Sequence, residues 1–555
     1  MLIKTQSSVR RLDCKSIHND KTTNRLEYPM NKERLKYLLI ILIPVILSAY
    51  THLWNLLGFP SFHIDEAHYM RRAMSVLNGM GPQEPAANAY PRTYDQPYFG
   101  QLFIAGILGL TGYPNSLHPG ADVHSIEMLH LVPRILMGLL AIVDTFILFK
   151  IVERRYSITL ALIAAIFFAI MPSTWLFRRV YLETILMPFL LSSILLALYL
   201  KVPKNTTLLN PKSRYEISKY VLILLSGILL GLAIYTKIPA FTMIPLVGTL
   251  VYFYSGKNVR CLGIWLIPVI IIPLLWPLYS IVVGQTDLWA YWVLWQVEER
   301  DRPLSISLAN FFTIDPVLVS IGVAGMAFTA IKKDFFPLLW ISPFLIFSYF
   351  VGWVQYFHLM LIFPAICISS ALLIGSIQRF IAKYSQVLSY TTVGIVFVFG
   401  IVSTTMLITL DVNSDYFRIF TAVAEKIPEA YQENKKITLI GSHWWVWDSY
   451  WISQYILNKP SEWIDPHLDP KFKDKILTDN VLIVADPIFV DSLSRKINSD
   501  NLRQIRNLYN ETTVIGSYAD NVTSQTKAYY PYNTLPIMIW NENHPTGKVV
   551  LKSNY

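Results

Sequence analysis

Long runs of apolar residues, each long enough to cross a lipid bilayer, constrain this chain more than any other feature. A transmembrane helix needs about 20 mostly apolar residues, because the hydrocarbon core is roughly 30 Å thick and a helix rises about 1.5 Å per residue. About eleven such runs precede residue 411, at 37–57, 132–151, 158–176, 182–200, 220–236, 238–254, 261–283, 313–331, 335–352, 359–377 and 389–410. The sequence therefore predicts an α-helical polytopic membrane protein.

The composition agrees with a membrane protein and excludes several other classes. Hydrophobic residues make up 53% of the 555 residues and charged residues only 15%, whereas soluble domains carry about 25% charged residues. Disordered, coiled-coil and collagen-like chains are excluded on the same ground. Three cysteines are too few for a disulfide scaffold. A net charge of +10 would point to nucleic acid in a soluble protein, but here its placement matters more, and we expect no nucleic-acid partner.

The placement of the basic residues predicts the orientation in the membrane. Cytoplasmic loops are enriched in Lys and Arg. With the N-terminus in the cytoplasm, the inner segments hold about 22 basic residues and the outer loops about nine. The sequence thus predicts a multi-pass protein of the cell membrane in three parts. These are a cytoplasmic basic tail (1–36), a transmembrane domain (37–410) with a long first outer loop (58–131), and an extracytoplasmic domain (411–555).

Residues 411–555 have the alternation expected of an α/β domain. Short β-branched and apolar segments predict strands at 437–441, 481–485, 512–516, 536–540 and 548–551. Helical stretches fit between them, at 415–431 and 446–457. Such a domain could bind a substrate or could serve only to cap the outer face.

An acid pair, Asp65 and Glu66, follows directly after the first predicted span. Residues 66–78 predict a short helix with Asp65 as its N-cap and Gly79 as its stop signal. A helix N-terminus favours an ionised carboxylate. Capping alone would account for both acids, but their position within about ten residues of a membrane exit favours a functional role.

Other ionisable and aromatic side chains fall on the same predicted side of the membrane. They are Arg92, Tyr94 and Asp95 in the first outer loop, Arg178, Arg179 and Glu183 after the third span, and Lys237, Arg300 and His358 further along. Each has an ordinary structural explanation, such as snorkelling or helix capping. As a group they predict one outer site at the membrane surface, where ionisable residues tend to be functional. The apolar stretch 99–112 is short for a span and predicts an interfacial helix beside this site.

The order of these motifs resembles GT-C glycosyltransferases, most closely the protein O-mannosyltransferase and aminoarabinose transferase group (families 39 and 83). Asp65-Glu66, the Tyr94 to Pro97 segment and the interfacial helix resemble that group's first outer loop. Four later segments resemble further family motifs: Leu131 to Arg134, Pro172 to Glu183, Gly231 to Lys237, and Tyr356 to Pro364. The similarity covers about residues 36–410. Walker A, Rossmann, CxxC and HExxH patterns are missing from the sequence.

The resemblance implies an inverting glycosyltransferase that acts on the outer face. Its donor would be a sugar, possibly mannose, on a polyprenyl or dolichyl phosphate, and its acceptor a protein or an envelope glycan. Asp65 would be the general base, with Glu66 as the second catalytic carboxylate. Both relatives carry a lysine near the proline of this loop, where this chain has Gln96 and Gln101. The resemblance therefore implies other cations for the donor phosphate: Arg92, Arg178, Arg179 and Lys237, with Arg71 or Arg72 as further candidates. Tyr94, Asp95, Glu183, Arg300 and His358 would support them.

Two alternatives remain. The segment from His443 to Ile452 resembles the Trp-Trp-Asp-Tyr-Gly motif of oligosaccharyltransferase catalytic subunits; that resemblance would imply an asparagine acceptor and a divalent metal. Otherwise no metal or other cofactor is expected, and the partners are the lipid-linked donor, the acceptor and membrane lipids. The second alternative, a polytopic transporter or lipid flippase, predicts ionisable residues near the bilayer centre, whereas here the acids lie in outer loops.

Overall fold

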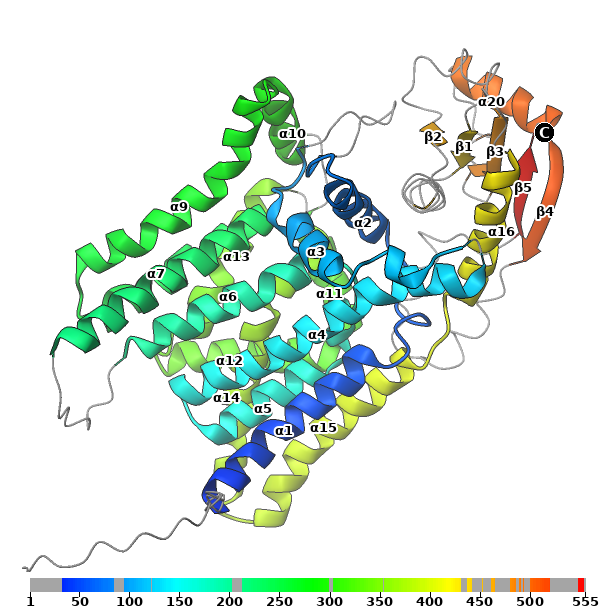
Figure 1. The fold of residues 1–555 in the computed structure, drawn as a ribbon. Coiled ribbons are helices and arrows are strands. Elements are labelled where there is room, and N and C mark those ends of the chain that lie inside the picture. Colours follow the sequence, from blue (N-terminus) through cyan, green and yellow to red (C-terminus); the bar gives the residue numbers. More distant parts are fainter. Residues whose placement is uncertain are drawn as a thin grey trace, which may run out of the picture. The chain divides into compact units, whose positions relative to one another are not determined.

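In the computed structural model (Figure 1), the described residues are 32–83, 94–120, 122–201, 212–298, 303–352, 354–430, 437–441, 452, 461–464, 480–485, 489–490, 493, 500–519 and 548–553. Contacts divide the chain into two units, Met1–Ile40 and Ile41–Tyr555. The first unit contains the start of helix α1, and the second contains every other described element.

The predicted apolar runs are helical. The helices that these runs form are α1 (Lys32–Leu53), α4 (Val123–Arg155), α5 (Ile158–Ile170), α6 (Leu182–Tyr199), α7 (Lys212–Thr236), α8 (Ile244–Tyr254), α9 (Val259–Val282), α11 (Leu304–Ile314), α12 (Pro316–Ile331), α13 (Phe336–Val351), α14 (Phe363–Ile381) and α15 (Gln386–Ile408). Among the described residues, seven helices are long and apolar enough to cross a membrane, or up to nine if each bent pair is one span. The chain is thus a helical multi-pass membrane protein.

The span count differs from the predicted eleven at two places. Ile238–Tyr254 and Phe336–Val351 are apolar helices of fewer than 18 residues. Two further spans are bent, by 66° between α5 and the 3₁₀ helix η2 (Pro172–Arg178), and by 116° between α11 and α12. In both bent pairs a proline occupies the first position of the second helix, where its missing N–H costs no hydrogen bond. Hydropathy counts apolar residues, and it does not register these breaks.

Three further helices lie between the predicted spans: α2 (Ile64–Leu77), α3 (Phe99–Leu110) and α10 (Thr286–Glu298). The prediction that Asp65 caps α2 is wrong, because the N-cap is His63 and Asp65 is the second helical residue. His63 forms a capping box with Glu66, which satisfies two of the orphan N–H groups at the helix start. Gly79, with φ at +73°, lies just past the C-cap, as predicted. Helix α3 packs on α2, and its 12 residues match the predicted short apolar helix.

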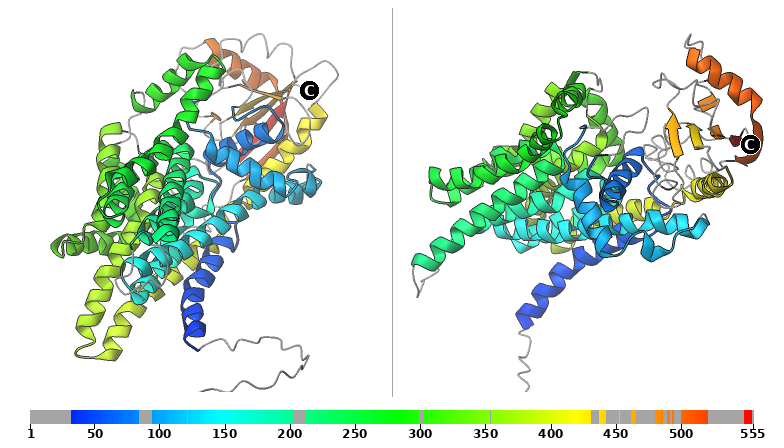
Figure 2. Two further views of the ribbon diagram at one scale, coloured as in Figure 1. Left: turned by 60° about the vertical axis from the view of Figure 1, so that its left-hand side comes forward. Right: turned by 45° about the horizontal axis from the view of Figure 1, so that its top comes forward.

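The helical part is held together by close helix pairs that use small residues. Helix α7 runs beside α9 in each view (Figures 1 and 2), and it also packs on α6. Helices α12 and α14 approach so closely at Gly325 that a Cβ there would overlap the backbone of Ser369. Helix α1 is tied to α15 by Tyr50 Oη, 3.3 Å from Thr405 Oγ1, and by Asn55, which donates to two carbonyl groups at the end of α15.

A five-stranded sheet forms the C-terminal part, as predicted for an α/β domain. Its strands are β1 (Ile437–Gly441), β2 (Ser461–Ile464), β3 (Asn480–Ala485), β4 (Thr513–Ala519) and β5 (Lys548–Ser553), in the order β2-β1-β3-β5-β4. β1 is parallel to β2 and β3, whereas β5 is antiparallel to β3 and β4. Strand β2 was not predicted. The predicted strand 536–540 and nearly all of the predicted helix 446–457 lie outside the described residues.

Both faces of β1 and β3 are covered by helices. On one face, Leu439 and Leu482 share a cluster with Phe420 of α16 (Ser414–Ala430). On the other face, Ile440 and Ile483 share a cluster with residues of α20 (Asp500–Glu511). Strands buried on two faces read as continuous apolar runs, which is why these segments were recognisable in the sequence.

Candidate active site

One face of α2 carries three ionisable side chains. Asp65, His68 and Arg72 are spaced three and four residues apart, so they lie on the same side of the helix. Two of them hold Asp95: Arg72 Nη2 lies 2.5 Å from Asp95 Oδ1, and His68 Nε2 lies 3.4 Å from Oδ2. Arg71 Nη2 approaches His68 Nδ1 at 3.5 Å. A guanidinium only donates, so Nδ1 accepts and Nε2 carries the proton directed at Asp95.

Asp95 is ionised in this setting. Burial by itself would raise the pKa of its carboxyl group, but the Arg72 guanidinium and the His68 ring more than offset burial and hold that pKa well below its usual range. Asp95 is therefore a fixed negative charge with acceptor capacity only.

A second buried cluster is built from residues that are far apart in the sequence. Lys237 is the N-cap of the 3₁₀ helix η3 (Ile238–Met243), and its Nζ lies 2.5 Å from Glu183 Oε1. His358, in the 3₁₀ helix η4 (Tyr356–Ile362), brings Nε2 to 3.7 Å from the same oxygen. Glu183 is the second residue of α6, and its Oε2 is buried without a hydrogen-bond partner among the described residues. One carboxylate thus holds two potential cations.

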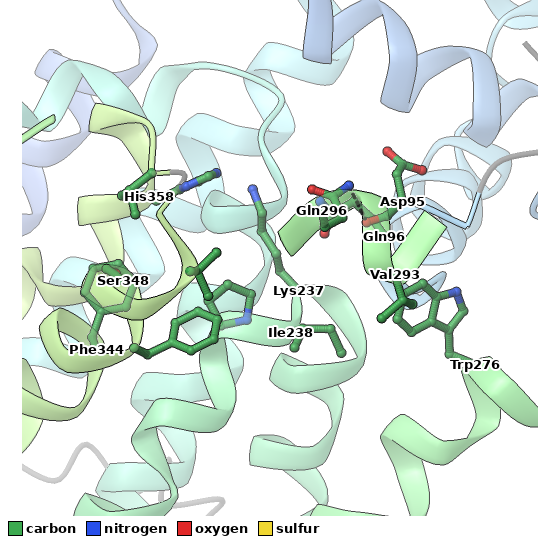
Figure 3. Close-up of a pocket in the computed structure, with 14 residues that line it drawn as sticks. Asp95, Gln96, Lys237, Ile238, Trp276, Val293, Gln296, Phe344, Ser348 and His358 are labelled. Carbon is green, nitrogen blue, oxygen red and sulfur yellow. Dashed lines mark hydrogen bonds between the residues drawn. The ribbon is translucent and has the colours of Figure 1, made fainter. Parts of the chain in front are cut away.

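The two clusters meet in a cavity of about 200 Å³. Its lining includes Asp95, Gln96, Lys237, Gln296, Ser348 and His358, together with apolar residues of α9, α10 and α13. Figure 3 shows the nitrogen and oxygen atoms of His358, Lys237, Gln296 and Asp95 along one side of the pocket, with Phe344, Ile238, Val293 and Trp276 along the other. The cavity therefore has a polar row above an apolar floor, an arrangement that suits an amphipathic ligand.

Helix α10 is bound to the first outer loop beside this cavity. Gln296 Nε2 donates to the carbonyl oxygen of Asp95 at 3.2 Å, and Tyr94 Oη donates to Gln285 Oε1 at 2.8 Å, just before α10 begins. Tyr94 is fully buried in an aromatic cluster that includes Trp276 and Trp292. The loop that carries Asp95 is thus fixed from two sides.

Glu66 is built into the framework of the site. Its carboxylate accepts four hydrogen bonds, from Arg134 Nε (3.0 Å) and Nη2 (2.8 Å), from the Val180 N–H (3.1 Å) and from the His63 N–H (3.1 Å). A carboxylate offers about four acceptor positions, so those of Glu66 are all used. Of the two neighbouring acids, Glu66 is thus nearly buried, with a side chain 6% exposed, whereas the Asp65 side chain is 30% exposed.

Arg178 and Arg179 lie apart from the cavity lining. Arg178 is fully buried and donates to the carbonyl oxygens of Thr51 and Trp54 at the end of α1. Arg179 donates to the Ser61 carbonyl, with Nε at 3.0 Å and Nη2 at 2.7 Å, and to the hydroxyl groups of two tyrosines. Both guanidinium groups are thus engaged by the protein itself, and of the predicted phosphate ligands only Lys237 reaches the cavity within the described part of the chain.

Asp65 lies at the edge of the same region, and its side chain is 30% exposed. Its Oδ2 lies 3.9 Å from His63 Nδ1, and the His63 ring packs on Phe357, the residue before His358. Burial, and next the Asp65 carboxylate, raise the pKa of Tyr69 well above its ordinary value. Asp65 is therefore a partly exposed carboxylate among buried tyrosines.

The structure thus brings together Asp95, Glu183, Lys237 and His358 from the predicted set. Arg92, Arg300 and the aromatic segment from His443 to Trp451 lie outside the described residues. Gln296 and His68 were missed. The spacing of four between His68 and Arg72 could have signalled a shared helix face, but the sequence holds no cue for the pairing of Gln296 with Asp95. Among the described residues, no three His, Cys, Asp or Glu side chains gather as metal ligands.

Solved structures of other proteins identify the fold of this chain. No family model and no curated protein sequence matches the chain, but solved structures do. ArnT from Cupriavidus metallidurans, bound to undecaprenyl phosphate, is 10% identical with a TM-score of 0.55, and the match covers 94% of this chain and 98% of ArnT. The oligosaccharyltransferase AglB from Archaeoglobus fulgidus, in complex with an inhibitory peptide and a dolichol-phosphate, is 10% identical with a TM-score of 0.54, covering 94% and 88%.

A further structure, the Archaeoglobus fulgidus oligosaccharyltransferase tethered with an acceptor peptide containing the NVT sequon, is 11% identical with a TM-score of 0.52, covering 82% of this chain and 69% of that enzyme. These structural neighbours are GT-C glycosyltransferases. The chain therefore has the GT-C fold, as the motif order predicted.

Proposed function

We propose that this protein is a membrane glycosyltransferase. It transfers a sugar from a polyprenyl-phosphate donor to a hydroxyl group of a protein or an envelope glycan, at the outer face of the membrane. The sugar is unassigned, with mannose as one candidate. The observation that carries this proposal is the amphipathic cavity, in which a lysine and a histidine stand in a polar row above an apolar floor.

The chemistry follows from these groups. The donor chain lies along the apolar floor, and its phosphate meets the Lys237 ammonium group and His358, which stabilise the negative charge of the leaving group. The acceptor oxygen attacks the anomeric carbon and forms the new glycosidic bond. The bond between that carbon and the phosphate oxygen breaks, and its electron pair leaves with polyprenyl phosphate. The acceptor proton passes to the Asp65 carboxylate. Attack opposite the leaving group inverts the anomeric carbon.

The role of Asp65 rests on its position. It shares a face of α2 with His68 and Arg72, which hold the cavity residue Asp95. It is also partly exposed, whereas the neighbouring Glu66 has its acceptor positions filled by the protein. A general base must come within hydrogen-bond reach of the substrate proton, and partial exposure makes Asp65 accessible to a substrate.

The experiment supplies purified protein with radiolabelled polyprenyl-phosphate mannose, glucose or arabinose and with envelope extracts as acceptors. Asp65→Asn is expected to lower transfer by about 100-fold or more, the usual contribution of a general base. Asp122→Asn is the matched control, because Asp122 is an exposed helix cap in the same loop. Equal transfer by Asp65→Asn and wild type would remove Asp65 as the base, and no transfer from any donor would count against the enzyme.

An oligosaccharyltransferase is the second candidate, favoured by the similarity to the archaeal enzyme over 94% of this chain. In that case the acceptor would be an asparagine in a sequon peptide, and a divalent metal would be required. Transfer to an NVT-type peptide that stops in excess chelator would support this candidate. Transfer to hydroxyl acceptors that continues in chelator would exclude it.

A further inference from the structure

The polar row of the cavity has two ends that differ in charge. One end holds Lys237 and His358 beside Glu183, and the other holds the Asp95 carboxylate with the Gln96 and Gln296 amides. A phosphate would be repelled by an ionised carboxylate, so Asp95 is unsuited to be its ligand. Carboxylates and amides do suit hydroxyl groups, because they accept the hydrogen bonds that hydroxyls donate.

Asp95 is also held in place before any ligand arrives. Arg72 and His68 each bind one of its oxygens, from one face of α2, and the Gln296 amide binds its backbone carbonyl. Arg72 is fully buried, which fixes the direction of the carboxylate. These two contacts with Arg72 and His68 occupy only part of the Asp95 carboxylate, which has about four acceptor positions. Preorganised acceptors are the means by which a site distinguishes hydroxyl patterns.

We propose that Asp95, positioned by Arg72 and His68, binds hydroxyl groups of the transferred sugar and so determines which sugar the site accepts. This inference rests on the proposed function, and it adds the sugar subsite. The phosphate would occupy the end of the polar row at Lys237 and His358, and the sugar the end at Asp95. His68 and Arg72 are positioning residues, since they act through Asp95.

The first test compares the best sugar donor with its monodeoxy analogues. The wild type is expected to disfavour at least one analogue by about tenfold or more in kcat/KM, because losing a hydrogen bond to a charged group has an effect of that order. In Asp95→Asn this ratio should fall to nearly one. Asp95→Glu, which keeps a charge for Arg72, should change which analogue is disfavoured. The control Asp122→Asn should leave the wild-type ratios unchanged. If Asp95→Asn slowed the parent donor and every analogue equally, the role would be structural and the inference would fail.

The second test measures binding without turnover. Wild type and Asp95→Asn are titrated with polyprenyl phosphate and with the same lipid bearing the sugar. The variant is expected to bind the bare lipid phosphate at least as tightly as wild type, because a negative charge has been removed, and to lose about tenfold in affinity for the sugar-bearing lipid. Equal losses for both lipids would overturn the sugar subsite while leaving the proposed function intact. If the wild type bound neither lipid, the proposed function itself would fail.

Discussion

At the scale of single residues, Lys237 has two roles. It forms an ion pair with the buried Glu183, and it lines the cavity with its ammonium group. Removing one member of a buried ion pair costs about 3–5 kcal/mol in the free energy of unfolding, whereas removing both is closer to neutral. We therefore expect Lys237→Gln to lower both thermal stability and donor binding. The double variant with Glu183→Gln should regain stability but still bind polyprenyl phosphate at least tenfold more weakly than wild type.

Differential scanning fluorimetry and lipid titration measure these two quantities. Lys150→Gln is the control, since Lys150 pairs with Glu153 on α4 rather than with a cavity residue. Full donor affinity in the double variant would remove Lys237 from the phosphate site.

Asp95 makes the stability of the folded protein depend on pH, and the direction of that dependence follows from its lowered pKa. Its folded-state pKa lies well below the ordinary value of about 3.9, so on acidification the unfolded chain takes up the proton first. The stabilisation from Asp95 is complete above about pH 5 and is lost as the pH falls through the folded-state pKa. The difference in unfolding midpoint between wild type and Asp95→Asn should therefore be constant from about pH 7 to 5 and shrink only below that range. A difference that had already vanished near pH 6 would contradict the ionised carboxylate.

Prediction from sequence was most successful for single elements and weaker for the contacts between them. The apolar runs and the buried strands β1 and β3 were recognisable because their signal is local. For the candidate site, the structure places four of the expected residues close together, namely Lys237, Glu183, Asp95 and His358, and their functional role stays a prediction. Arg178 and Arg179 were expected at the phosphate, but they donate to backbone carbonyls more than 100 residues away. No local pattern encodes such pairings, because any carbonyl group is an equal acceptor.

At the scale of helix pairs, Gly325 sets how closely α12 and α14 approach. A methyl group at Gly325 would overlap the Ser369 backbone, whereas one at Gly263 in α9 would meet no atom within 4 Å. Small residues allow close packing of membrane helices. We expect Gly325→Ala to lower the unfolding midpoint clearly, with a free-energy cost of about 1–3 kcal/mol from overpacking. Gly263→Ala should be neutral or slightly stabilising, because alanine is the better helix former. Equal midpoints for the two variants would contradict this packing.

At the scale of the whole molecule, the predicted orientation can be tested with single cysteines in a background that lacks Cys14, Cys261 and Cys367. Arg34→Cys near the start of α1 and Val514→Cys on β4 both introduce cysteine at exposed positions. In intact cells an impermeant maleimide should label only the second variant, and after permeabilisation it should label both. Labelling of Arg34→Cys alone in intact cells would reverse the orientation and move the site to the cytoplasmic face.

Three arginines around the end of α1 donate hydrogen bonds to the main chain rather than to side chains alone. Arg134, Arg178 and Arg179 donate to the backbone carbonyls of residues 51–61. A carbonyl oxygen remains in place when the side chain beside it changes. A change of side chain at Trp54 or Leu56 therefore leaves the arginines their acceptors. Asn55 and Ser61 differ, because they also form hydrogen bonds through their side chains. Arg134, which binds two of these carbonyls, also holds the Glu66 carboxylate, so main-chain bonding in this segment helps to fix the position of that acid.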